Sequence, residues 1–424
     1  MNVHVWPTDR FKTFSISVYI GTKLDEEHVT KTALLPFVMR RGTQSYPQTK
    51  QFRERLDELY GAGFGFDIYK RGDYQIVQFK MDTIHPQFVP SEQQDLLAAS
   101  ISFLGEALTR PLIENGSFRE SYVEAEKNTL KNRIQSMIND KIRYAAERCT
   151  EELCKDEPYR LHPLGQLSQI EALTSAELYT YYKQWIEQSM IDIYVVGDTR
   201  LEEVTAHLEN SFDLSHRNEE VRSYLPAEPV LSNQPIRTVV DELEVGQGKL
   251  NLGLRSAITF AHPSYPVMLM YNGILGAYPH SKLFVNVREK ASLAYYAASR
   301  YEGHKGILTI QSGIEIDQFE KAVDIIKQQL QWMKDGDISE LELNQTKAMI
   351  MNQLRELNDS SFEMMAFDFN GILSGKHRSQ EELIGQINRI QKTDIQQIAD
   401  QLQLELIYFL RNRKEAAAHA SETL

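Results

Sequence analysis

The sequence lacks the features that mark secreted and membrane-spanning proteins. It has 2 cysteines in 424 residues, Cys149 and Cys154, too few for a small domain held together by disulfides. A membrane-spanning helix needs a run of about 18 or more apolar residues, and no such run occurs. Residues 1–14 contain no apolar leader segment. We therefore expect reduced cysteines, no contact with a membrane and a cytoplasmic location.

Positive charge is scarce as well. The chain has 46 Lys and Arg against 59 Asp and Glu, a net charge of −13. A nucleic-acid-binding protein needs clustered cations to neutralise phosphates, so we expect no nucleic-acid partner. The hydrophobic share of 42% is ordinary for a globular protein. At roughly 100–200 residues per domain, the length predicts more than one domain.

Paired histidines are missing too. A zinc site on a helix needs two histidines four residues apart, because that spacing places both imidazoles on one face. None of the 11 histidines has a second histidine at that spacing. The G-x-S-x-G pattern of a serine nucleophile is also absent. The motifs therefore predict no zinc site on a helical histidine pair and no readable serine nucleophile, and a metal site assembled from distant histidines stays open.

The order of apolar and polar residues predicts alternating strands and helices. Residues 13–20 alternate like a half-buried strand, and residues 30–41 and 49–60 follow with helical periodicity. Residues 61–82 read as a hairpin that turns at 71–73. Residues 117–154 are helical by period. From 213 to 235 the pattern breaks in a polar, proline-containing stretch, which predicts a linker.

After the linker the sequence starts over. YPQTKQF at 46–52 matches YPHSKLF at 278–284, and each lies between a first and a second predicted helix. We therefore predict an α+β fold of two homologous halves, each a β-sheet with helices packed on one face, forming a clamshell. The expected ranges are an N-terminal half (1–212), a linker (213–235), a C-terminal half (236–412) and a polar tail (413–424).

One segment of the second half carries candidate chemistry. Arg288 and Tyr295 are seven residues apart, across a predicted helix-to-strand junction. An arginine can hold a peptide carbonyl, and a tyrosine hydroxyl can donate to a developing oxyanion. A solvated cationic helix face and a core tyrosine would explain the same two residues. On chemistry alone, this second and purely structural interpretation is favoured over the functional one.

Several segments together resemble the insulinase/pitrilysin-type zinc metallopeptidases, including the mitochondrial processing peptidases. The resemblance covers nearly the whole chain, and its segments occur in the family's order. The second-half segment, residues 281–299, is a close match to the family's signature there. The segments that carry the resemblance are residues 20–26, 33–43, 56–74, 158–182, 191–204 and 281–299.

The resemblance also reveals departures at the zinc site. The family's zinc helix reads His-x-x-Glu-His. Here Ala33 stands at the first ligand histidine, Pro36 at the catalytic glutamate that activates the zinc-bound water, and Phe37 at the second ligand histidine. The family's third ligand is a glutamate on a later helix, seven residues after another glutamate. Glu126 fits the earlier acid, which places Arg133 at the ligand position. Without these ligands there is no metal-activated water. The resemblance therefore implies no metal bound by this chain and no catalytic residue of its own.

The resemblance implies a substrate-binding role for Arg288 and Tyr295, which fall on the family's Arg/Tyr pair with the same spacing. Some family members divide the work, so that one subunit carries zinc and its partner carries this pair. We therefore expect the metal-free subunit of a heteromeric zinc peptidase, with a peptide substrate and a zinc-bearing relative as heterodimer partner. The alternatives are a non-hydrolytic protein of peptide binding or maturation, and an autonomous peptidase with an unrecognised metal site.

Overall fold

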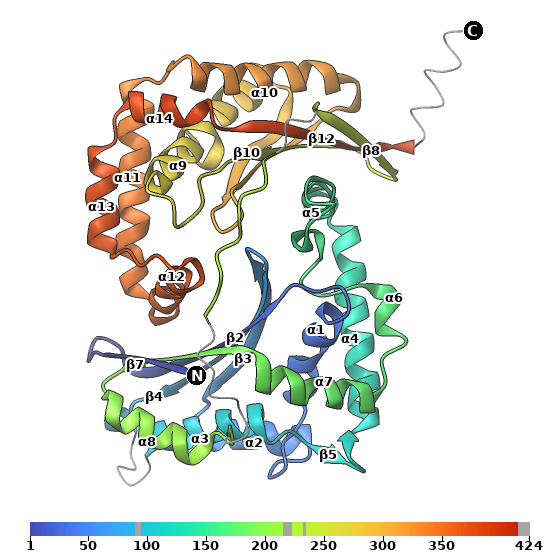
Figure 1. Ribbon diagram of the computed structural model, residues 1–424, viewed down its shortest axis with the longest axis vertical. Helices are drawn as coiled ribbons and strands as arrows, with labels where there is room; N and C mark the ends of the chain where they lie inside the picture. The colour runs from blue at the N-terminus through green and yellow to red at the C-terminus, as the bar shows by residue number, and fades with distance from the viewer. Residues whose placement is uncertain (90–94, 215–222, 232–234, 414–424) are drawn as a thin grey trace. The chain divides into compact units, whose positions relative to one another are not determined.

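The computed structural model describes residues 1–89, 95–214, 223–231 and 235–413, and its described residues form two compact units (Figure 1). The first unit comprises residues 1–135, 161–224 and 360–367. The second comprises residues 136–160, 225–359 and 368–424. Among the described helices, none combines the length and the apolar character needed to cross a membrane.

The first unit is built on a five-stranded sheet in the order β1-β7-β2-β4-β3. Its neighbours are antiparallel except β1 and β7, which run parallel. The predicted strand and hairpin are confirmed, with the turn at Gly72 and Asp73. The strands are β1 (Asn2–Pro7), β2 (Thr13–Lys23), β3 (Gly63–Arg71), β4 (Tyr74–Ile84) and β7 (Met190–Gly197).

Helices pack on the apolar face of this sheet. Phe14, Ile16 and Val18 of β2 belong to this face and are buried, because alternate residues of a strand point to the same side. Ser15 points to the opposite face, where it hydrogen-bonds Ser361 at 2.7 Å. The helices are α1 (Val29–Met39), α2 (Thr49–Glu58), α3 (Leu96–Thr109), α4 (Glu120–Asn139), α6 (Leu167–Ile170), α7 (Ser175–Gln188) and α8 (Leu201–Ser211), with a short turn η1 (Pro86–Phe88) and hairpin β5 (Ile113–Glu114) and β6 (Ser117–Phe118).

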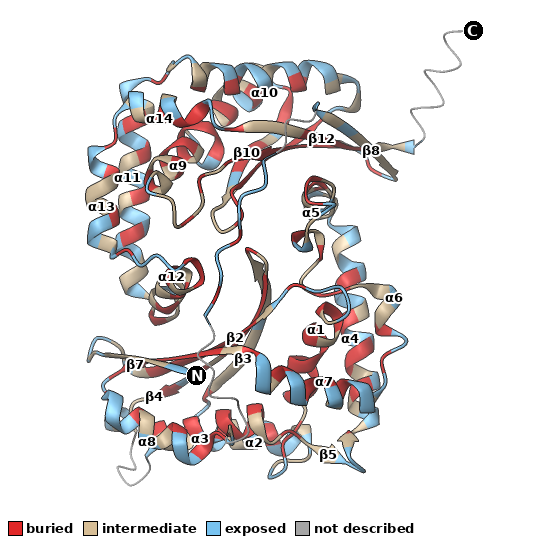
Figure 2. Ribbon diagram, viewed as in Figure 1, coloured by how far each residue is buried: buried red, intermediate tan, exposed pale blue. Residues whose placement is uncertain are grey.

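The second unit repeats this sheet in the order β10-β11-β9-β12-β8, again with one parallel pair at the edge, β12 and β8. The same topology and the same pairing directions confirm two homologous α+β halves. Figure 2 shows the inner strands of both sheets largely buried, whereas the edge strands β1, β3 and β8 are mostly intermediate. The strands are β8 (Arg237–Leu243), β9 (Gly248–Arg255), β10 (Ala294–Glu302), β11 (Ile307–Ile314) and β12 (Gln403–Asn412).

The helices of the second half cover the face of Leu250, Leu252 and Leu254, which are all buried. Gly248 is the first residue of β9. A Cβ atom added to it would lie 2.7 Å from the Phe409 ring. The helical elements are α9 (Tyr265–Asn272), η3 (Gly273–Ala277), η4 (Leu283–Lys290), η5 (Ile316–Gln318), α10 (Phe319–Lys334), α11 (Glu340–Glu356), η6 (Leu357–Asp359), α12 (Ser361–Ser374), α13 (Gln380–Arg389) and α14 (Lys392–Ala399).

The opposite face of the second sheet is covered by a helix from the first half of the sequence. The helical stretch predicted over 117–154 divides at Asp140, where α5 (Lys141–Leu153) begins. The Asp140 side chain caps this helix by accepting a hydrogen bond from the Arg143 backbone N–H. Figure 1 shows α5 and α10 on opposite sides of β12. A Cβ on Gly253 would lie 3.0 Å from Leu153. The absence of a side chain at Gly253 lets α5 approach the sheet closely.

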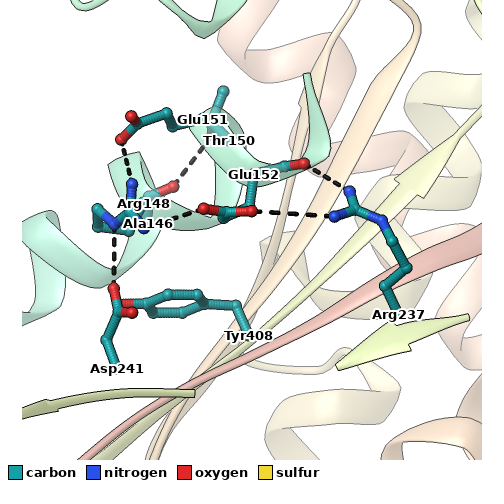
Figure 3. A network of polar contacts seen from close by, with 8 residues as sticks. All are labelled: Ala146, Arg148, Thr150, Glu151, Glu152, Arg237, Asp241 and Tyr408. Atoms are coloured by element: carbon teal, nitrogen blue, oxygen red, sulfur yellow. Dashed lines mark hydrogen bonds and ion pairs between the residues drawn. The ribbon is translucent and has the colours of Figure 1, made fainter. Parts of the chain in front are cut away.

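Polar contacts hold α5 to β8 and β12 (Figure 3). Arg148 lies 3.0 Å from Asp241, which also accepts a 2.8 Å hydrogen bond from Tyr408. Arg237 donates to the Glu152 carbonyl oxygen at 2.6 Å. The chain continues into the short turn η2 (Pro158–Arg160), which packs against α5.

The compact units therefore divide the chain differently from the predicted ranges. Residues 136–160 lie within the predicted first half, but α5 packs on the second sheet. Residues 360–367 lie within the predicted second half, but they belong to the first unit. In the predicted linker, residues 215–222 and 232–234 lie outside the described residues, as do residues 414–424 of the predicted tail.

Both cysteines are free and buried.

Candidate functional site

Helix α1 carries the three predicted positions of the zinc helix, and it is apolar over most of its length. Ala33 is fully buried and Phe37 is 2% exposed. Pro36 lies inside the helix, where it removes one backbone donor because proline has no N–H. A methyl group, a pyrrolidine ring and a phenyl ring offer no lone pair to a metal. Pro36 also has no group that could act as a general base.

The structure brings two of the predicted motif positions together. The guanidinium carbon of Arg133, on α4, lies 5.8 Å from the centre of the Phe37 ring. Arg40 lies 5.5 Å from the same ring and 5.2 Å from the Phe66 ring of β3. Phe37 and Phe66 meet edge to face at 4.8 Å. Cation–π contacts thus surround the position at which the family places a histidine ligand.

The nearby carboxylate is already paired. Glu126 lies two turns before Arg133 on α4 and is 4% exposed. Its Oε1 atom lies 3.3 Å from Nε of Arg41, and the Arg41 guanidinium carbon lies 5.1 Å from the Tyr122 ring. Arg40 and Arg133 flank Phe37, and their positive charges would repel a divalent cation. The residues at these positions therefore do not fit a zinc ion.

One other group of metal-type side chains occurs among the described residues, just before and at the start of α1. Its members are Asp25, Glu27 and His28. Nδ1 of His28 lies 2.8 Å from Asp25, and Nε2 lies 3.8 Å from Glu27. Both carboxylates are exposed to solvent. These contacts form a cluster of polar side chains on the surface at the helix start.

Arg288 lies on η4, a helix with wide turns. The Ala291 N–H donates to the carbonyl oxygen of Asn286, five residues back, at 3.2 Å. Turns of this π type are rare and occur frequently at functional sites. Leu283 and Val287 are fully buried and anchor the helix, whereas the Arg288 side chain is exposed and lies 4.5 Å over the Phe284 ring.

Tyr295 lies on the edge strand β10, at an irregularity in its pairing. The register with β11 shifts between Ala294 and Tyr296, so Tyr295 occupies a bulge, which redirects a side chain. The side chain is 64% exposed. The sequence left a core tyrosine open as an alternative, and this exposure excludes it. Since η4 packs against β10, Arg288 and Tyr295 come from neighbouring elements of one unit.

Sequence reasoning missed the partner of Tyr295. Its hydroxyl donates a 2.8 Å hydrogen bond to Oε1 of Glu315, which directly follows β11. That hydrogen bond, together with the negative charge of Glu315, raises the pKa of Tyr295 above its ordinary value. The hydroxyl therefore keeps its proton at neutral pH and remains a donor. The contact lies where the pairing is irregular, next to the pair Ala294 and Ile314, so no regular hairpin register in the sequence could have indicated it.

Comparison with known proteins identifies relatives over the full length. A family model described as "Peptidase M16 inactive domain" matches residues 172–350. The probable inactive metalloprotease YmfF of Bacillus subtilis is 39% identical over 98% of this chain and 97% of its own. The uncharacterized zinc protease YmxG of the same organism is 25% identical over 92% and 90%.

A solved structure shares the fold. The crystal structure of a conserved protein from Enterococcus faecalis V583 superposes with a TM-score of 0.88 at 31% identity. The match covers 97% of this chain and 96% of that protein. The similarity therefore extends over both sheets and their helices.

Proposed function

Because this chain belongs to the M16 peptidase family but lacks the family's metal-binding side chains, we propose that it is the metal-free subunit of a heteromeric zinc peptidase. By itself the chain is not catalytic. In the proposal, a zinc-bearing relative is the partner and a peptide is the substrate. Arg288 and Tyr295 bind that peptide at the partner's zinc centre.

The contrast between the two halves carries this proposal. The motif positions of the first half are apolar or cationic, with Ala33 and Phe37 buried and Arg133 against the Phe37 ring. The second half keeps Arg288 and Tyr295 on exposed and irregular backbone. A chain that had lost its substrate as well as the metal would need neither an exposed Arg288 nor a Tyr295 placed at a bulge. The relatives named a probable inactive metalloprotease and a zinc protease in one organism also support a division of labour.

The two side chains suit different steps. The Arg288 guanidinium presents several N–H donors in a fixed plane and can orient a peptide carbonyl or carboxylate. Tyr295 keeps its proton and can donate to the oxyanion of a tetrahedral intermediate. Its single O–H now points to Glu315, so it must leave that acceptor when the peptide binds. Glu315 thereby holds the hydroxyl in its neutral form between turnovers.

The test is peptide turnover by a mixture of this chain and its zinc-bearing relative. Replacing Tyr295 with Phe removes a single hydroxyl, and loss of one oxyanion donor lowers kcat about 100- to 1,000-fold. Arg288→Ala should lower kcat/KM at least about tenfold, the loss expected for a charge-assisted hydrogen bond. Tyr296→Phe and Arg300→Ala are the matched controls from the same strand. Unchanged turnover with retained peptide binding would instead favour a non-hydrolytic peptide-binding protein.

Metal content provides a second test. The purified chain should hold no stoichiometric zinc, whereas its partner should hold one ion. One tightly bound zinc per molecule of this chain alone would contradict the proposal and favour an autonomous peptidase. Elemental analysis after dialysis measures this directly.

A cytoplasmic location is part of the same proposal. Cys149 and Cys154 are free and buried, which suits a reducing compartment. Cell fractionation tests this, and recovery outside the cytoplasm would contradict it.

A further inference from the structure

A cavity of about 330 Å³ opens in the second unit between α10, α14 and one end of the sheet. Leu254 of β9 and Leu404 of β12 contribute from the sheet, and Ala399 from the end of α14. The volume falls in the range of about 300–1,000 Å³ found for small-molecule sites. Its aliphatic lining consists of Ile236, Leu254, Leu330, Ala399, Leu402 and Leu404.

One side of the cavity is cationic. Lys327, Gln331 and Lys334 of α10 all line it, since residues three and four apart share a helix face. No ion pair joins either lysine to a described residue. The described lining residues include no carboxylate. In a chain with a net charge of −13, two unpaired lysines beside an apolar surface mark a place for an anion.

A buried tyrosine also lines the cavity. Tyr271 of α9 is 1% exposed, and burial raises the pKa of its hydroxyl above the ordinary value. No described residue forms a hydrogen bond with this hydroxyl. Buried polar groups usually find a partner, so the Tyr271 O–H is a donor that a ligand can satisfy.

We propose that this cavity binds an aliphatic carboxylate of the size of a medium-chain fatty acid. The tail covers the apolar lining and removes it from water. The carboxylate pairs with Lys327 and Lys334 and accepts a hydrogen bond from Tyr271. A peptide terminus would bring amide groups that need partners of their own, and Gln331 is the single amide side chain among the described lining residues. This favours a free aliphatic acid.

The experiment titrates the full chain with octanoate by isothermal calorimetry, with 1-octanol and octylammonium as probes of the same tail. We expect saturable binding of octanoate, about tenfold weaker binding of 1-octanol, and no measurable binding of octylammonium. Equal affinity for octanoate, 1-octanol and octylammonium would show an apolar surface without an anion site and would overturn the proposal. Absence of octanoate binding would overturn it as well.

Variants locate the site. The double variant Lys327→Ala/Lys334→Ala should weaken octanoate binding at least about tenfold, and Lys321→Ala, on the same helix but outside the lining, should leave it unchanged. Tyr271→Phe keeps the ring in place and should weaken binding severalfold, with an unchanged circular dichroism spectrum. Equal losses for Lys321→Ala and the double variant, or full affinity in the double variant, would place the ligand elsewhere and refute the assignment.

Discussion

Replacing Glu157 with alanine should destabilise the second unit severely. Glu157 follows α5, and its Oε1 atom accepts a hydrogen bond from Arg255. Its Oε2 atom lies 2.8 Å from Nζ of Lys305. Arg255 and Lys305 are each 3% exposed. The substitution therefore takes one carboxylate away from two buried cations.

The magnitude follows from the cost of leaving a buried charge without its partner. Breaking a buried ion pair from one side costs about 3–5 kcal/mol. Arg255 keeps a second carboxylate, since its Nε atom lies 3.4 Å from Glu405, so we expect a loss near the lower end, about 3 kcal/mol. For a unit of about 150–250 residues, each kcal/mol shifts Tm by about 2–4 °C. Glu157→Ala should thus lower the Tm of the second unit by roughly 6–12 °C.

Differential scanning calorimetry measures this shift, and hydrogen exchange across α5 tests its location. A chain with two compact units need not unfold in one step, so the transition of the second unit is the one to follow. Glu151→Ala is the matched control, because Glu151 lies on α5 but is 51% exposed and pairs with Arg148 at the surface. Such pairs contribute about 0–1 kcal/mol. Equal Tm shifts for the two variants would refute the reasoning.

Two further predictions concern the degenerate zinc motif and a titrating histidine. The triple variant Ala33→His/Pro36→Glu/Phe37→His should bind zinc weakly. Adding Arg133→Glu should tighten zinc binding at least about tenfold, because a carboxylate then replaces a cation beside position 37. A competition assay with a zinc dye measures both affinities, and equal affinity with and without the Arg133 change would contradict the geometry. Burial lowers the pKa of His280 below its ordinary value of about 6.5, outweighing the Glu342 charge that raises it. The unfolded state therefore takes up the proton first as the pH falls below about 6.5, and the native state loses stability there; an NMR titration midpoint of His280 at or above that value would contradict this prediction.

Local periodicity was enough for most elements. The alternation over 13–20 and the helical period over 49–60 correspond to β2 and α2. Both patterns depend on which face of a single element is apolar, and that is visible from neighbouring residues alone. Strand β1 (Asn2–Pro7) was missed although its residues alternate, because its pairing is with β7, 190 residues later in the chain.

The candidate site divides in the same way. The loss of zinc donors at Ala33, Pro36 and Phe37 is readable from the sequence, because these side chains have no lone pair to offer in any fold. The contact of Phe37 with Arg133 joins two helices far apart in the chain. The hydrogen bond from Tyr295 to Glu315 depends on the shifted register of β10. Neither contact could be read from spacing.

The sequence alone determined the repeat of two α+β halves and the absence of metal ligands in the first, because periodicity and side-chain chemistry are local properties. The tertiary structure decided which sheet α5 covers, which cations Glu157 neutralises and that two lysines of α10 line the same cavity as Tyr271. An amphipathic helix shows that it must bury one face, but several apolar surfaces can satisfy that requirement. Shape and charge complementarity among distant segments select one of them, and these exist only in the folded chain.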